Sequence, residues 1–89
     1  MQVTVHFYGH LGFLTGRKEG VLSFQENAVA VGMVLAAAAK TWPKLKNAVG
    51  ETGGVQPSLL MSVNGVIAGN SSLVKDGDQL QFFPLVGGG

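Results

Sequence analysis

The sequence predicts an α+β fold in which one main helix covers one face of a mixed β-sheet. Three observations point to this class: alternating segments open the chain, one segment near the middle has helical spacing, and further strand-like segments follow. With 89 residues, the chain has room for one compact domain. We expect that domain at residues 1–86, followed by a flexible glycine tail at residues 87–89.

The first two predicted strands flank a glycine-rich segment. Residues 2–8 alternate in polarity, with Val3, Val5 and Phe7 on one face. Alternation with a period of two, among β-branched and aromatic residues, is typical of a half-buried strand. Residues 21–25 predict a second strand, which we expect to run antiparallel to the first.

The segment between these strands, residues 9–20, predicts a loop. It contains four glycines, and clustered glycines are a strong local signal for turns and loops. Its apolar residues, Leu11, Phe13 and Leu14, are expected to pack onto the core.

The main helix is predicted at residues 28–41. Apolar side chains recur there at intervals of three and four residues, and four consecutive alanines favour helix strongly. Pro43 is expected to stop or kink the helix, because proline disfavours helical geometry in the residue before it. We expect a further helical turn at residues 44–49 and a loop at 50–57. Ala30 stands where a capping serine or threonine would be usual.

The last part of the chain predicts three more strands. Asn64-Gly65 is a strong tight-turn signal, because both residues tolerate a positive φ. The remaining predicted elements are strands at residues 59–64, 66–68 and 79–85, with a turn at residues 75–78. If the first and last strands lie side by side at the centre of the sheet, they run parallel and the fold is a β-grasp, the ubiquitin-like topology.

Composition and charge exclude several function classes. The net charge of +1 does not favour a nucleic-acid partner, and the absence of cysteine excludes disulfides and thiolate metal sites. The longest apolar run, residues 28–39, is shorter than the roughly 20 residues that a membrane span needs. No basic-then-apolar leader is recognisable, so we expect a cytoplasmic protein with no membrane partner. The charged fraction of 12% is low, which suggests apolar surface available to a partner.

No conventional catalytic or metal site is recognisable in the side chains. His6 and His10 lack carboxylates at a spacing typical of a triad or metal partner, and we expect structural or solvent-exposed roles for both. Asp76 and Asp78 are explained by turn chemistry. We therefore expect no metal and no bound cofactor.

The glycine tail is the remaining candidate for chemistry. Gly87, Gly88 and Gly89 follow an apolar stretch. Such a segment has no side chains to obstruct its entry into another protein's active site. A terminal carboxylate on Gly89 would be ionised at neutral pH and could attack an activated phosphate. The alternative is an inert, frayed end.

The chain resembles the MoaD/ThiS family of β-grasp sulfur carriers, and within it MoaD, the small subunit of molybdopterin synthase. The matching segments are spread in order along nearly the whole chain. They are residues 3–9, Ala30-Val31, residues 42–45, residues 63–65, residues 73–78 and residues 82–88.

This resemblance implies a sulfur-transfer cycle in which the catalytic side chains belong to partner proteins. An E1-like adenylating enzyme of the MoeB/ThiF type would use ATP to adenylate the carboxylate of Gly89, or of Gly88 if the tail is trimmed. A sulfur donor would then convert the acyl-adenylate to a thiocarboxylate. A large synthase subunit of the MoaE type would accept the tail, and the sulfur would pass to a pterin precursor. The residues expected to form or border that interface are Phe82, Phe83, Pro84, Leu85 and Val86.

Adjacent residues on a strand face opposite ways, so one of Phe82 and Phe83 is expected in the core and the other at the interface. Three alternatives stay open. The sulfur recipient could be thiamine, cysteine or another thiolated product. The protein could be a ubiquitin-like modifier of lysines, or a non-covalent β-grasp binding module.

Overall fold

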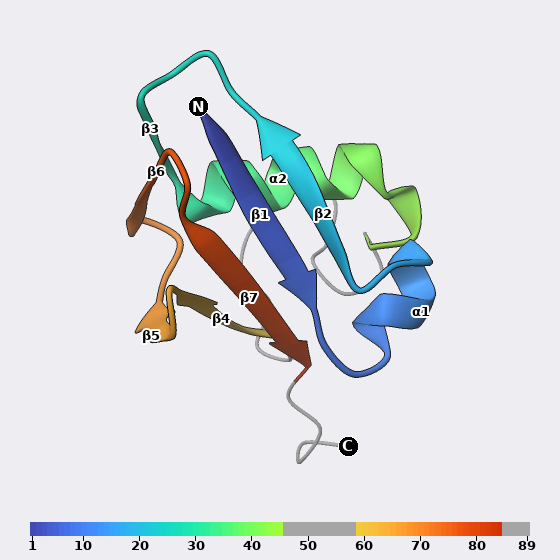
Figure 1. The fold of residues 1–89 in the computed structure, drawn as a ribbon. Helices are drawn as coiled ribbons and strands as arrows, with labels where there is room; N and C mark the ends of the chain where they lie inside the picture. Colours follow the sequence, from blue (N-terminus) through green and yellow to red (C-terminus); the bar gives the residue numbers. More distant parts are fainter. Residues whose placement is uncertain (46–58, 85–89) are drawn as a thin grey trace.

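In the computed structural model, which describes residues 1–45 and 59–84, strands from the two ends of the chain lie side by side at the centre of the main sheet (Figure 1). β1 (Gln2–Phe7) and β7 (Gln79–Pro84) run parallel, with Phe7 opposite Phe82. The outer strands, all antiparallel to their neighbours, are β2 (Glu19–Ser23) beside β1, β4 (Leu59–Val63) beside β7, and β5 (Val66–Ala68) beside β4. The order β2-β1-β7-β4-β5 confirms the predicted β-grasp.

The helix α2 (Val31–Thr41) crosses one face of this sheet and encloses the core (Figure 1). The inward side chains of β1 are all buried, as the alternation predicts. They pack with the buried face of α2 because neither element can remove its apolar side chains from water alone. Strands β4 and β7 add further side chains to this core. The fully buried large side chains of β1, α2, β4 and β7 are Val3, Val5, Val31, Val34, Leu35, Met61, Leu80 and Phe82.

The main helix begins later than the sequence predicts. The segment β3 (Ala28–Ala30) is a strand that pairs antiparallel with β6 (Leu73–Lys75) in a second, small sheet. The alanine-rich sequence favours helix locally, but pairing with β6 and burial of Val29 determine the observed conformation.

The N-terminus of α2 is capped without a side chain. Ala30 makes no capping hydrogen bond. The amide of Val31 donates to the carbonyl of Ser72 at 2.8 Å, and the amide of Gly32 donates to the carbonyl of Asn70 at 3.0 Å. These carbonyls accept hydrogen bonds from two of the N–H groups that have no partner within the helix, so a capping serine or threonine is not required.

The prediction that residues 9–20 form a loop is wrong in part. It contains a short helix, α1 (Leu11–Thr15), and its last two residues belong to β2. Leu11 is buried and Leu14 packs against the core, as expected. Phe13 is 90% exposed, contrary to the expectation that it packs onto the core. Leu11 and Leu14 share one face of α1 because they are three residues apart, and that spacing turns Phe13 outward.

The turns in the described residues form largely as the sequence predicts. Asn64 and Gly65 both have positive φ, at 52° and 85°, as the predicted tight turn requires. Asp78 accepts a hydrogen bond from the amide of Lys75, which confirms its role in turn chemistry. The turn after the main helix is a 3-10 turn, η1 (Pro43–Leu45). The predictions at residues 46–58 and 85–89 lie outside the described residues.

Neither α1 nor α2 is long and apolar enough to cross a membrane, and this holds for every helix in the described parts of the chain.

Candidate functional site

The end of β7 is held in place by the residues that follow β1. The amide of Tyr8 donates a hydrogen bond to the carbonyl of Phe82 at 3.1 Å. The rings of Tyr8 and Phe83 are stacked, with centroids 4.6 Å apart and planes inclined by 13°. Tyr8 and Gly9, which we call the β1 clamp, therefore fix the strand at the point from which the tail continues.

Gly9 completes this clamp through its backbone. Its φ is +59°, a backbone conformation that residues other than glycine and asparagine rarely adopt. A Cβ built on Gly9 would lie 2.8 Å from Cγ of Pro84, closer than two carbon atoms can pack. The close approach of Gly9 to Pro84 therefore depends on the missing side chain.

The two phenylalanines before the tail face opposite ways, as predicted. Phe82 is fully buried, and its ring meets that of Phe7 edge-on at 6.0 Å. Phe7 in turn meets Trp42 at 5.1 Å. Phe83 lies on the other face and is half-buried against Tyr8. Among the described residues of the predicted interface, Phe82 to Pro84, the accessible ones are thus Phe83 and Pro84.

The other residues predicted for the site lie beyond the described part of the chain. They are Leu85, Val86, Gly87, Gly88 and Gly89. Their roles remain predictions.

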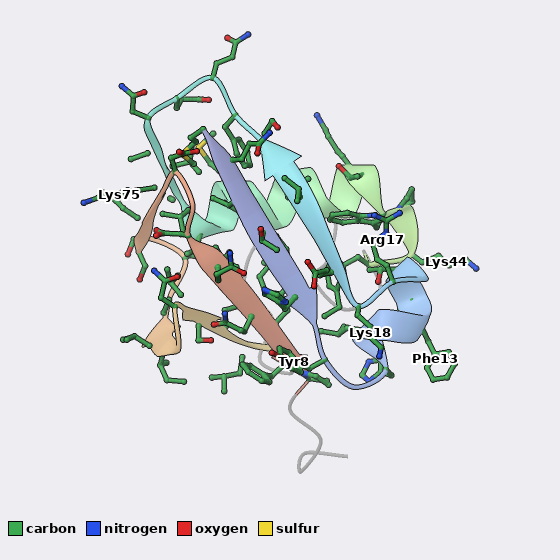
Figure 2. The ribbon with its side chains drawn as sticks, in the orientation of Figure 1. Tyr8, Phe13, Arg17, Lys18, Lys44 and Lys75 are labelled. Carbon is green, nitrogen blue, oxygen red and sulfur yellow. The ribbon has the colours of Figure 1, made fainter. Side chains whose placement is uncertain are left out.

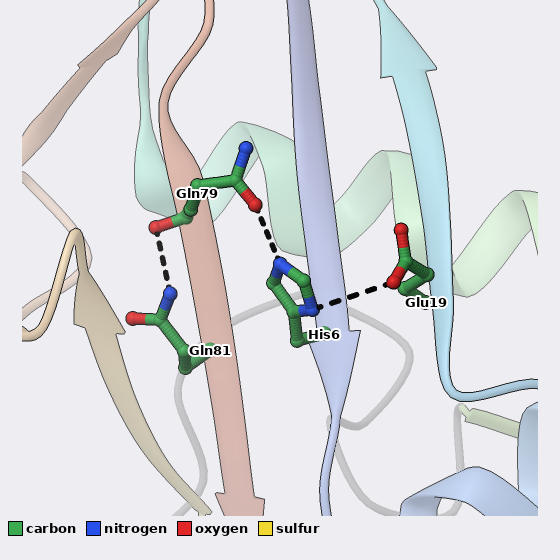
Figure 3. Close-up of polar contacts among 4 residues, drawn as sticks. All are labelled: His6, Glu19, Gln79 and Gln81. Carbon is green, nitrogen blue, oxygen red and sulfur yellow. Dashed lines mark hydrogen bonds and ion pairs between the residues drawn. The ribbon is translucent and has the colours of Figure 1, made fainter.

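The face of the sheet opposite α2 carries a row of polar side chains (Figure 3). His6 Nε2 lies 2.6 Å from Oε1 of Gln79, and its Nδ1 lies 4.0 Å from Oε1 of Glu19. The side-chain Nε2 of Gln81 donates a hydrogen bond to the main-chain carbonyl of Gln79.

This row also includes Ser62, which is buried and donates its hydroxyl to Oε1 of Gln81. The hydrogen bonds join β1, β7 and β4, so the row stabilises strand pairing. This is the structural role expected for His6. In residues 1–45 and 59–84, no cluster of three or more His, Asp or Glu side chains is arranged to hold a metal ion.

Sequence reasoning missed Tyr8 and Gly9 as site residues. Both stand at the end of the first strand, and a parallel first and last strand would have placed them beside Phe83 and Pro84. The missing signal was therefore the register of that pairing, which local patterns do not contain. The sequence predicted a structural or solvent-exposed role for His6. It did not predict the neighbour Glu19, because Glu19 lies in β2 and is brought beside His6 only by strand pairing.

Comparisons with known proteins agree with this architecture. The model of the ThiS family matches residues 5–89. A comparison with curated protein sequences gave no match. Among solved structures, the chain is similar to SAMP1 from Haloferax volcanii, with a TM-score of 0.88 and 23% identity, covering 100% of each chain.

Two further similar structures are of proteins named for molybdopterin. One is from Pyrococcus furiosus and is described as molybdopterin converting factor, subunit 1; it has a TM-score of 0.81 and 27% identity, covering 97% of this chain and 99% of that chain. The other is the complex of subunits 1 and 2 of the molybdopterin-converting factor from Helicobacter pylori, with a TM-score of 0.63 and 22% identity over 100% of each chain. Given the β-grasp topology and a family match over nearly its whole length, the chain belongs to the ThiS family of ubiquitin-like sulfur carriers.

Proposed function

We propose that this sulfur carrier is charged at the carboxylate of Gly89 and delivers sulfur for the synthesis of molybdopterin. An E1-like enzyme would bind ATP and let the carboxylate attack the α-phosphate, which releases pyrophosphate and forms an acyl-adenylate. A sulfur donor would then displace AMP and leave a thiocarboxylate. If the tail is trimmed, Gly88 takes the same role.

The observation that carries the proposal is the anchoring of β7. β7 is a central strand, paired on both sides, and its end is held by Tyr8 and Gly9. Five residues follow Pro84, with a maximum span of about 17 Å when fully extended. A rigid origin combined with a short segment that ends in glycines suits insertion into a partner's active site.

The proposed partners are an E1-like adenylating enzyme and a large synthase subunit. The Helicobacter pylori structure is a complex of two subunits, and this supports a second subunit for the present chain. Phe83 and Pro84 are the described residues proposed for that interface, together with Leu85 and Val86 beyond them. Aromatic side chains commonly supply much of the binding energy at such surfaces. Phe82 supports the interface from within the core.

A second candidate function is protein modification. The likeness to SAMP1, whose full name in a related structure is small archaeal modifier protein 1, favours it. In that case, the activated glycine would form an amide with a lysine of another protein. Delivery of sulfur to thiamine or cysteine synthesis uses the same charged form and differs only in the recipient.

A two-step reconstitution tests the proposal. The purified protein is first charged with ATP, the activating enzyme from the same source and sulfide, and then repurified. It is offered separately to the large synthase subunit with cyclic pterin precursor and to a thiazole synthase with its substrates. We expect the thiocarboxylate to return to carboxylate only in the first mixture, with formation of the dithiolene product. Transfer only to the second acceptor would overturn the molybdopterin assignment, and lysine conjugates in lysate without sulfur transfer would favour the modifier.

A further inference from the structure

The charged side chains of the described residues are distributed unequally between the two ends of the sheet. Arg17 and Lys18 precede β2, and Lys44 lies in η1 beside α1 (Figure 2). At the opposite end, near β6, Lys75 is accompanied by Asp76 and Asp78. The fold therefore gathers cations from two separate segments of the sequence around α1.

An exposed aromatic ring lies among these cations. Phe13 is the most exposed large apolar side chain in residues 1–45 and 59–84, at 90%. It lines two neighbouring surface hollows, one with Arg17 and Lys18 and the other with Lys44. Phe13 therefore forms a ridge with positive charge on both sides, and we call Phe13, Arg17, Lys18 and Lys44 the α1 surface.

Packing preorganises part of the α1 surface. The guanidinium of Arg17 lies 5.5 Å from the centroid of the Trp42 ring, within the range of a cation–π contact. An arginine held over a ring keeps its donors directed outward, ready for a carboxylate. Less side-chain freedom remains to be lost when a ligand binds.

The larger of the two hollows is wide enough for several side chains and adjoins the β1 clamp. Its volume is about 700 Å³, and its lining includes Tyr8 and Gly12. Tyr8 is the residue whose ring stacks on Phe83. A ligand in this hollow would thus contact the clamp that holds β7.

We propose that the α1 surface binds an acidic segment of a partner protein, with carboxylates on Arg17, Lys18 and Lys44 and an apolar side chain against Phe13. This goes beyond the proposed function, which uses the end of β7 and the tail. Charge complementarity identifies the ligand as acidic, and the exposed ring identifies it as a segment that also carries an apolar group. A nucleic acid is disfavoured because Arg17, Lys18 and Lys44 form no continuous basic stripe.

Titration of the full-length ¹⁵N-labelled protein with a probe peptide tests this proposal. The probe is Glu-Asp-Glu-Leu-Phe-Asp-Glu, and its matched control replaces every acid by the corresponding amide. We expect shifts at the amides of Phe13, Arg17 and Lys18, together with a change in fluorescence of Trp42, the only tryptophan. Affinity for the acidic peptide should fall at least about threefold as salt rises and screens the charges. Absence of binding at millimolar peptide, or equal binding of the amide peptide, would overturn the proposal.

Charge reversal with a matched control locates the binding. Arg17→Glu and Lys18→Glu should each weaken binding about tenfold, whereas Lys75→Glu makes the same change in net charge at the other end and should weaken it less than about twofold. Phe13→Ala should weaken binding several-fold, and Ile67→Ala, at a side chain 65% exposed on β5, should not. Equal effects of Arg17→Glu and Lys75→Glu would show that only net charge matters and would overturn the assignment to the α1 surface. Tighter binding of a single-stranded oligonucleotide at the same residues would replace the protein ligand by a nucleic acid.

Discussion

The ring of Tyr8 lies flat against the ring of Phe83, with centroids 4.6 Å apart and planes inclined by 13°. Tyr8 belongs to the segment that leaves β1, and Phe83 lies at the end of β7. The stack joins the beginning of the chain to the residues that lead into its glycine tail. It therefore fixes the end of β7, the strand from which the proposed reactive tail continues.

Replacing Tyr8 by alanine should impair charging of the protein more than folding. The Tyr8→Ala variant loses the stack, and we expect kcat/KM of the activating enzyme for this carrier to fall about three- to tenfold, because a poorly oriented tail enters the active site less often. Tyr8→Phe should behave like the wild type, since stacking needs the ring and not the hydroxyl. Initial rates of ATP–pyrophosphate exchange measure the effect. If the phenylalanine variant were as impaired as the alanine variant, the stack would not be the cause.

Gly9→Ala should destabilise the fold in two ways, by steric overlap of the new Cβ with Pro84 and by the strain of alanine at a positive φ. Gly9 and Gly16 both have positive φ, at 59° and 72°, but only Gly9 has a neighbour, Pro84, within 4 Å of the position that a Cβ would take. Alanine at positive φ costs about 1 kcal/mol at either position. We expect Gly9→Ala to cost about 1–2 kcal/mol more than Gly16→Ala, because of overlap with Pro84. Urea unfolding measures both, and equal losses would contradict the Gly9–Pro84 contact.

The adjacent phenylalanines should respond to truncation in opposite ways. Phe82→Ala removes a fully buried ring and should lower the free energy of unfolding by about 3–5 kcal/mol. Phe83→Ala removes a half-buried ring and should cost about 1 kcal/mol of stability. The second variant should nevertheless weaken binding to the large synthase subunit. Thermal unfolding and calorimetric titration separate the two effects, and a well-folded Phe83→Ala with wild-type affinity would remove Phe83 from the interface.

Gly20→Ala should disturb Trp42, the only tryptophan of the chain. A Cβ at Gly20 would overlap the six-membered ring of Trp42, which is itself packed against Phe7. We expect a loss of about 2–4 kcal/mol in the free energy of unfolding and altered tryptophan emission. Gly69→Ala is the control, because nothing lies within 4 Å of its Cβ position. A wild-type emission spectrum and stability for Gly20→Ala would contradict the packing described for Trp42.

Local patterns in the sequence predicted the elements that depend on local chemistry. The alternation around Val3 and Val5 predicted a half-buried strand. Asn64-Gly65 predicted the turn between β4 and β5, because tolerance of a positive φ is a property of the residues themselves. The parallel pairing of β1 with β7 came from assuming that the first and last strands are central. The resemblance to the MoaD/ThiS family supported that assumption.

What the sequence could not predict depends on partners distant along the chain. Ala28–Ala30 has a helical pattern, but it forms a strand because β6 lies beside it. Phe13 was expected in the core, and the short helix that turns it outward has no strong local signal. The gathering of Arg17 and Lys44 around α1 follows from the contact between α1 and η1, which no spacing in the sequence indicates.

Intact mass spectrometry of the protein after incubation with ATP, the activating enzyme from the same source and sulfide tests the central claim most directly. We predict a gain of about 16 Da, as one oxygen is replaced by sulfur, and no gain when residues 87–89 are deleted. A version ending at Gly88 serves as a second substrate, to cover trimming of the tail. If an enzyme active on another carrier charges neither version, the thiocarboxylate proposal is wrong and a non-covalent binding role takes its place.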